Sequence, residues 1–154
     1  LGLNQNKMLE IAKKIGADVP FFIYGDNAYG KGIGDTLEFK ESIRDKILLI
    51  DPKINNSSAE MFELFDNFKQ SNKNTSNYPQ NDFWDVFLER NKSIREFFTK
   101  INKNHDLNLS GSGSCMFVKY NKREDIEGIL KKIPSNWRFF FCKPLQYSPL
   151  MKFV

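Results

Sequence analysis

The sequence is poor in the residues that most often hold metals. It contains two cysteines, Cys115 and Cys142, and one histidine, His105, and none of these forms a CxxC pair. Structural zinc sites use four closely spaced ligands, so the composition argues against zinc and we assign no residue to a metal. Both cysteines lie in apolar runs and are expected to be buried, reduced thiols, while His105 lies in a polar loop and is expected at the surface.

Long apolar runs, a secretory signal, clusters of basic residues and internal repeats are also missing. No apolar stretch approaches the roughly 20 residues that cross a bilayer, and no signal-peptide pattern is present. Lysine and arginine exceed the acidic residues only by 23 to 19, and they are spread along the chain. We therefore expect a cytoplasmic protein that binds neither membrane nor nucleic acid.

What the sequence does contain is enough apolar material for a core. Of its 154 residues 40% are hydrophobic, including 15 phenylalanines, which is typical of a globular chain of about one domain. The chain opens on Leu1 and reads as the end of a loop that runs into a helix, so we expect a piece of a longer protein. Its many asparagines and lysines fit an AT-rich, bacterial coding sequence.

Residues 1–38 are interpreted as the last helix and β-hairpin of a preceding domain. Apolar residues recur at helical spacing over 5–15, with Asn4 or Asn6 as N-cap and Gly16 as the end. Strands are predicted at 20–24 and 27–31 around a turn at residues 25–27, and a further strand within 33–39.

Residues 39–154 are predicted to form an α+β domain of ferredoxin-like type, in which helices cover one face of an antiparallel sheet. A polar loop is expected at 69–80. Ser57 and Glu60 fit a capping box at the start of the first helix of this domain. The expected strands are 46–50, 107–109, 115–120 and 138–143. One helix is expected to begin at Ser57, and three more are expected at 82–89, 93–101 and 122–133. A tail follows from residue 144.

Asp18 stands at a corner between the first helix and the apolar run that follows. Pro20 has no N–H and disfavours a helical conformation at Val19, which stiffens the corner. A carboxylate held in this way suits a general base or the partner of a cation. The alternative is a carboxylate that only accepts backbone N–H groups within a turn.

Two glycine-rich segments are further candidates. Ser110-Gly111-Ser112-Gly113-Ser114 could cup a phosphate with its N–H groups, or could be a hairpin turn with close backbone packing. It lacks the lysine and the following helix of a Walker loop. The strip 30–35 has the wrong spacing for a dinucleotide fingerprint, and we interpret it as a twisted or bulged strand.

Ser58 and Phe62 are four residues apart and share a helix face. An aromatic ring at this position could stack on a nucleobase, although phenylalanine at helical spacing is more often part of a core.

Several motifs occur together and in a fixed order, and they make the chain resemble a known enzyme family. They are GADVPFF (16–22), AYGKGIGDTL (28–37), LLIDP (48–52), SSAEMF (57–62), Asn81-Asp82 before a helix, LSGSGSC (109–115) and SPL (148–150). In this order they resemble the C-terminal part of the 4-diphosphocytidyl-2-C-methyl-D-erythritol kinases, which belong to the GHMP kinase superfamily. The resemblance covers nearly the whole chain.

The resemblance implies transfer of phosphate from ATP, with Mg²⁺, to the 2-hydroxyl of a cytidine-diphosphate-linked methylerythritol in non-mevalonate isoprenoid synthesis. It implies that Asp18 is the catalytic base. Its implied substrate-binding residues are Gly32, Ile33, Ser58 and Phe62, and Phe62 stacks on the base. Gly111, Ser112 and Gly113 match the third family motif, which packs beside the phosphate-binding loop.

The same resemblance points to parts that these 154 residues do not contain. The family's phosphate-cradling loop and the lysine that pairs with the catalytic aspartate would precede Leu1, so we expect the chain alone to be inactive. Two alternatives stay open. One is a non-catalytic ferredoxin-like binding or regulatory module in which Asp18 is structural, and the other is a different small-molecule GHMP kinase, such as homoserine or mevalonate kinase.

Overall fold

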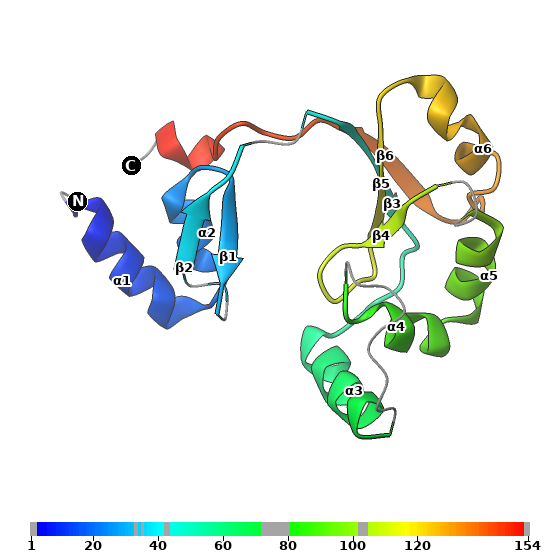
Figure 1. Ribbon diagram of the computed structural model, residues 1–154, viewed down its shortest axis with the longest axis horizontal. Helices are drawn as coiled ribbons and strands as arrows, with labels where there is room; N and C mark the ends of the chain where they lie inside the picture. Colours follow the sequence, from blue (N-terminus) through cyan, green and yellow to red (C-terminus); the bar gives the residue numbers. More distant parts are fainter. Residues whose placement is uncertain are drawn as a thin grey trace. The chain divides into compact units, whose positions relative to one another are not determined.

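A computed structural model describes residues 3–32, 34, 36–41, 44–71, 81–101 and 105–152 (Figure 1). The chain divides into two compact units, Leu1–Arg44 together with Pro144–Val154, and Asp45–Lys143. The expected boundary between residues 38 and 39 therefore precedes the observed division. The tail from residue 144, expected to belong to the second domain, groups with the first unit because it bonds to the segment after its second helix.

Helix α1 (Gln5–Ile15) opens the first unit, as its apolar spacing predicts. The Asn4 side chain caps it, with Oδ1 accepting a hydrogen bond of 2.9 Å from the Lys7 N–H. Ala12 is buried, and its carbonyl accepts the N–H of Gly16 at 3.2 Å. Gly16 ends the helix in an extended conformation, with φ 173°.

The predicted strand at 20–24 is wrong, because this segment forms helix α2 (Val19–Tyr24). Pro20 lies in the first turn, where its missing N–H costs nothing, and it is fully buried. Gly25 ends the helix in the left-handed conformation, with φ 85°, and its N–H donates to Phe21 O at 3.2 Å. The glycine expected to turn a hairpin is therefore a helix C-cap.

The hairpin lies further along, where β1 (Ala28–Lys31) pairs antiparallel with β2 (Thr36–Phe39). Lys31 and Glu38 form an ion pair across it at 2.7 Å. The C-terminal segment, which ends in the short helix η2 (Pro149–Lys152), returns to this unit. There Ser148 N donates to Gly25 O at 2.6 Å, so residues far apart in sequence are joined.

The second unit contains a four-stranded antiparallel sheet, as predicted. Its strands are β3 (Lys46–Asp51), β4 (Leu107–Leu109), β5 (Met116–Tyr120) and β6 (Arg138–Cys142). Their spatial order is β4-β5-β3-β6, with every neighbouring pair antiparallel. With helices between β3 and β4 and between β5 and β6, this order is the ferredoxin-like topology.

Three of the predicted helices are present as α3 (Ser58–Ser71), α4 (Trp84–Arg90) and α5 (Lys92–Ile101). The predicted helix at 122–133 is instead a 3₁₀ turn, η1 (Arg123–Ile126), followed by the short α6 (Glu127–Leu130). The carboxylate of Asp125 accepts the Lys122 N–H at 2.8 Å and so caps the 3₁₀ turn, while Gly128 is a poor helix former. Of the loop expected at 69–80, the first three residues extend α3, and 72–80 lie outside the described residues.

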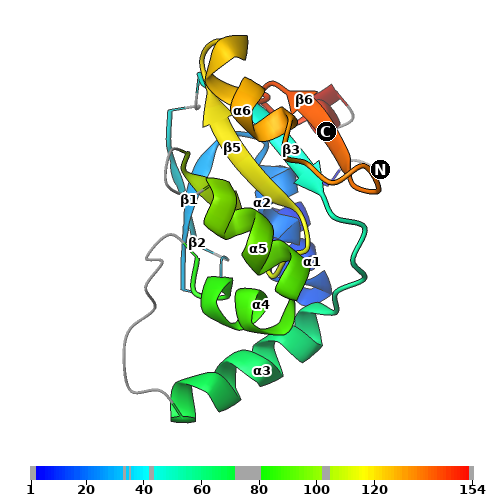
Figure 2. The same cartoon turned by 90° about the vertical axis from the view of Figure 1, so that its right-hand side faces the viewer.

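The core of the second unit lies between the sheet and its helices. Figure 2 shows α5 and α6 in front of the sheet, with α4 below α5. Leu48 of β3 is paired with Val118 of β5 and with Phe141 of β6, so the three side chains point to the same face of the sheet. The fully buried large side chains of this core are those of Leu48, Ile50, Met61, Trp84, Phe87, Ile94, Ile101, Met116, Ile126 and Ile129.

The two cysteines are less buried, and the histidine is less exposed, than the sequence predicts. Cys115 and Cys142 are free thiols but only half-buried. His105 is also half-buried, close to Gly128. No helix in the described part of the chain is long and apolar enough to cross a membrane.

Candidate functional site

Asp18 occupies the N-cap position of α2, on the corner that follows α1. The Val19 N–H donates to Gly16 O at 3.2 Å and Pro20 is fully buried, so the backbone is held on both sides of Asp18. Its carboxylate is exposed and makes no capping hydrogen bond to the helix. The alternative of a turn-forming carboxylate requires such a bond, so this geometry favours a carboxylate left available for chemistry.

The glycine strip forms the turn of the β1–β2 hairpin, close to this corner. Gly32 and Gly34 both have positive φ, at 65° and 94°, and Gly34 N donates to Lys31 O at 3.1 Å. A Cβ on Gly34 would lie 3.9 Å from the carbonyl oxygen of Ala17, the neighbour of Asp18. The structure thus places this turn beside the Asp18 corner. The predicted substrate residue Ile33 lies outside the described residues.

In the second unit, residues 110–114 form a tight turn between β4 and β5. Gly113 N donates to Ser110 O at 3.0 Å, and Ser110 N donates to Cys115 O at 2.9 Å. Gly111 and Gly113 both have positive φ, at 57° and 91°. A Cβ on Gly113 would lie 3.0 Å from the ring of Phe87, so one glycine is needed for packing, whereas a Cβ on Gly111 would contact nothing within 4 Å.

Hydrogen bonds to two other segments hold this turn in place. Asn56 Nδ2 donates to Ser112 O at 2.5 Å, and Asn81 Nδ2 donates to Leu109 O and Gly111 O at 3.0 and 2.9 Å. Ser114 Oγ donates to Ile54 O at 2.7 Å. The turn is therefore held mainly through its carbonyl groups. Sequence reasoning did not assign a role to Asn56 or Asn81, although Asn81-Asp82 is one of the motifs behind the family resemblance.

Ser58 and Phe62 lie at the start of α3, and Ser58 contacts the same turn. Ser58 and Ser112 share a hydrogen bond of 2.8 Å between their hydroxyls. Phe62 is 57% exposed, and it meets Phe83 edge to face at 5.0 Å between ring centres. The expectation that phenylalanine here is core is thus wrong, and the Phe62 ring is largely open to solvent. Only half of the predicted capping box forms, since Glu60 pairs with Arg90 at 2.7 Å.

The predicted site residues therefore gather in two places. Asp18 and Gly32 lie in the first unit, where the hairpin turn approaches the corner. Ser58, Phe62 and Gly111-Ser112-Gly113 lie in the second unit, where a hydrogen bond joins Ser58 to Ser112 and Phe62 lies one helical turn further along α3.

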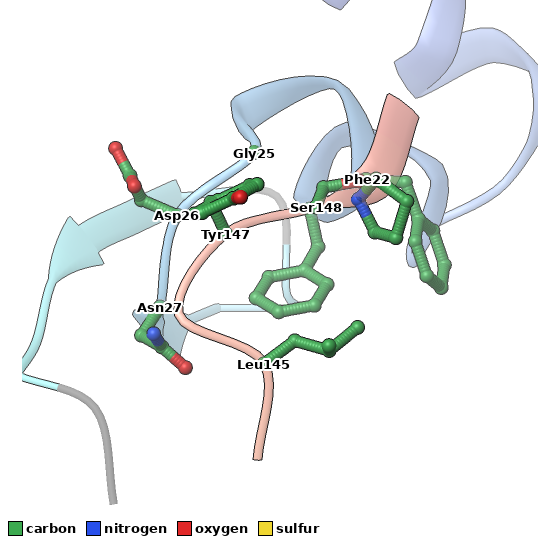
Figure 3. Close-up of a pocket in the computed structure, with 9 residues that line it drawn as sticks. Phe22, Gly25, Asp26, Asn27, Leu145, Tyr147 and Ser148 are labelled. Carbon is green, nitrogen blue, oxygen red and sulfur yellow. The ribbon is translucent and has the colours of Figure 1, made fainter. Parts of the chain in front are cut away.

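A small pocket of about 140 Å³ lies elsewhere in the first unit, at the C-terminal end of α2. Figure 3 shows Leu145 and Tyr147 of the C-terminal segment beside α2 and Gly25, while the Asp26 carboxylate points away. Since Asp18 is at the opposite end of α2, no residue predicted to function lies in this pocket. Its lining residues are Phe21, Phe22, Gly25, Asp26, Asn27, Leu145, Tyr147, Ser148 and Pro149.

Electrostatics near the glycine turn argue against a cysteine nucleophile. Burial, together with the negative charge of Asp51, raises the pKa of Cys115, so its thiol stays protonated at neutral pH. The pKa of Asp51 is in turn lowered, chiefly by the hydrogen bond of 2.8 Å from Lys53 N and then by Arg138. Within the described residues no three histidine, cysteine or acidic side chains cluster as metal ligands.

No family model matches the sequence. Curated relatives nevertheless cover almost all of it. The 4-diphosphocytidyl-2-C-methyl-D-erythritol kinase of Shewanella halifaxensis is 30% identical over 155 residues, which cover 97% of this chain and 55% of that protein. The enzyme of the same name from Francisella philomiragia is 28% identical over 152 residues, covering 95% and 54%.

A solved structure supports the fold independently of sequence. A crystal structure of 4-(cytidine 5′-diphospho)-2C-methyl-D-erythritol kinase matches with a TM-score of 0.67 at 15% identity, covering 91% of this chain and 56% of that one. The family resemblance noted in the motifs is thus confirmed, and so is the α+β fold. The chain spans about half the length of the curated relatives it matches.

Proposed function

We propose that this chain is part of a small-molecule kinase that transfers the γ-phosphate of ATP to the 2-hydroxyl of 4-diphosphocytidyl-2-C-methyl-D-erythritol, a step of non-mevalonate isoprenoid synthesis. The observation that carries the proposal is the Asp18 carboxylate, exposed and uncommitted on a rigid corner. Similarity to kinases of this name along nearly the whole chain supports it. Because the reaction consumes ATP and a nucleotide-linked alcohol, we place it in the cytoplasm.

In this proposal Asp18 is the general base. It accepts the proton of the attacking hydroxyl and orients that oxygen toward the γ-phosphate. Such a base must be held still while its oxygen atoms stay open to substrate. The buried Pro20 and the bond from Val19 N to Gly16 O supply the rigidity, and the absence of a capping bond leaves the carboxylate open. Gly32, in the neighbouring turn, and Ile33 are the substrate-binding residues that the family resemblance adds in this unit.

The second unit contributes binding rather than chemistry. We propose that Gly111, Ser112 and Gly113 pack beside the phosphate-binding loop of the complete protein and, through N–H groups of their turn, help it to hold the ATP phosphates. We further propose that the exposed ring of Phe62 stacks on the cytosine, next to Ser58. A base stacked on an aromatic ring gains about 1–3 kcal/mol. Mg²⁺ would accompany the phosphates of ATP, and we assign none of its ligands to this chain.

The test is Asp18→Asn in the complete protein that contains this chain. Loss of a general base lowers kcat by roughly 10²–10⁴-fold. We expect that loss with KM values within about threefold of the original, because asparagine keeps the shape of the side chain. Stability should not fall, since no capping bond is removed. The readout is ATP consumption in a coupled assay, beside a thermal melt.

Asp26→Asn is the matched control, because Asp26 is an exposed carboxylate at the other end of α2. It should leave kcat unchanged. An Asp18→Asn protein with full activity and lowered stability would favour the non-catalytic module instead. Parallel assays with homoserine and mevalonate decide between GHMP kinases. The 154-residue chain alone should show negligible turnover, and activity equal to the complete protein would contradict that expectation.

A further inference from the structure

The glycine turn at 110–114 is held by asparagine side chains, and one of them has an unusual geometry. The Asn81 amide nitrogen bridges two carbonyl oxygens, those of Leu109 and Gly111, at 3.0 and 2.9 Å. Its Oδ1 accepts the Phe83 N–H at 2.9 Å. Asn81 therefore donates both amide hydrogens to the turn, and its side-chain oxygen accepts the N–H of Phe83, the N-cap residue of α4.

The bonds to the turn fix the direction of its peptide groups. With the Gly111 carbonyl engaged by Asn81 and the Ser112 carbonyl engaged by Asn56, neither peptide can rotate without breaking a hydrogen bond. Within the part of the chain that the structure describes, the N–H groups of Gly111 and Ser112 donate no hydrogen bond. Consecutive free N–H groups in a turn with positive φ can bind an anion, provided that the peptides stay fixed.

We infer that Asn81 is a positioning residue for nucleotide binding, assisted by Asn56. Asn81 does not touch the nucleotide. Its bond to Gly111 O fixes the peptide group that carries the Ser112 N–H. Asn56 fixes the peptide group that carries the Gly113 N–H, and that N–H in turn holds Ser110 O and so the peptide group of the Gly111 N–H. The N–H groups of Gly111 and Ser112 thereby stay aimed at phosphate oxygens. This inference rests on the proposed function, in which this turn supports the phosphates of ATP, and it adds two residues for which neither local chemistry nor the family resemblance supplied a role.

The test is Asn81→Ser in the complete protein. A serine hydroxyl can still accept the N–H two residues ahead, so the start of α4 keeps its acceptor, while both donors to the turn are lost. The change also adds no charge near the phosphates. Asn91→Ser is the matched control, because Asn91 Nδ2 donates to a backbone carbonyl, that of Phe87, also at 2.9 Å, at the other end of α4.

Two measurements are made on each variant. The first is hydrogen exchange of the Ser110 and Gly113 amides, whose bonds to the Cys115 and Ser110 carbonyls depend on the shape of the turn. The second is steady-state kinetics with Mg²⁺-ATP and 4-diphosphocytidyl-2-C-methyl-D-erythritol. We expect Asn81→Ser to speed exchange at least fivefold. We also expect it to raise KM for ATP about tenfold, the order expected when the phosphate loses one well-made hydrogen bond from the turn. KM for the alcohol should stay within twofold.

Asn91→Ser should lower the melting temperature but leave loop exchange and KM for ATP unchanged. If Asn81→Ser does not fold, Asn56→Ser provides the same comparison through a single bond to Ser112 O, with a rise in KM for ATP of about threefold. The inference is overturned if the Ser110 and Gly113 amides exchange no faster in Asn81→Ser than in Asn91→Ser. It is also overturned if they exchange faster in Asn81→Ser while KM for ATP stays unchanged. An unsubstituted protein with no kinase activity refutes the proposed function instead, and exchange alone then decides whether Asn81 holds the turn.

Discussion

Replacing Gly113 by alanine tests whether the turn at 110–114 is as tightly built as the structure indicates. Gly113 has φ 91°, and a Cβ there would lie 3.0 Å from Phe87 Cε2 and 3.2 Å from Leu109 Cδ1. Both neighbours are buried, at 0% and 3% exposure, so neither side chain can swing into solvent.

The expected cost has three parts. A left-handed backbone costs alanine roughly 1–2 kcal/mol, and crowding in a packed core costs about 1–3 kcal/mol. Alanine also restricts the unfolded chain more than glycine does, which offsets about 0.4–1 kcal/mol of this loss. Gly113→Ala should therefore lower the free energy of unfolding by about 3 kcal/mol.

Gly111→Ala is the control for this change. It also has a positive φ, 57°, but its Cβ would contact nothing within 4 Å, so only the backbone terms apply and the cost is below about 1.5 kcal/mol. Urea unfolding followed by tryptophan fluorescence measures both, because the only two tryptophans, Trp84 and Trp137, are buried in the second unit. Equal losses in the two variants would refute the argument that Gly113 is required for packing.

Two further predictions concern side chains near this turn. Asp51 has a pKa below its ordinary value because Lys53 N and then Arg138 hold its charged form, so its stabilising effect is complete at neutral pH and is lost as pH falls below about 4. Asp51→Asn should lower the free energy of unfolding at pH 7 and flatten its decline between pH 5 and 3, and an unchanged acid slope in urea titrations would contradict this. Phe62→Ala should raise KM for the cytidine substrate about tenfold with little loss of stability, since Phe62 is 57% exposed. Phe65→Ala, which removes a half-buried ring 5.3 Å from Phe83, should lower the stability and leave KM for the cytidine substrate nearly unchanged. Equal KM values in the two variants would exclude stacking on Phe62.

Local pattern was sufficient for most elements of the second unit. The run at 46–50, the apolar spacing of α5 and the short strands around the serine-glycine turn predicted the element order of a ferredoxin-like sheet, and the structure has that order. The pattern failed at 20–24, where aromatic and β-branched residues favour a strand. Pro20 and Gly25 are placed as helix start and stop, and the burial of Pro20 in the first unit outweighs the propensity of its neighbours.

The sequence by itself determined the family resemblance, the helix-corner that carries Asp18 and the class of the second unit, because these depend on residue types at short, fixed spacing. Only the tertiary structure decided that the Asp18 carboxylate caps nothing, that the C-terminal tail bonds to Gly25, and that Asn56 and Asn81 grip the turn at 110–114. Each of these features depends on which parts of the chain come into contact when it folds. Hydrogen bonds between residues 28 to more than 100 positions apart leave no periodic signal in the chain, so their partners are fixed only when the sheet and helices pack.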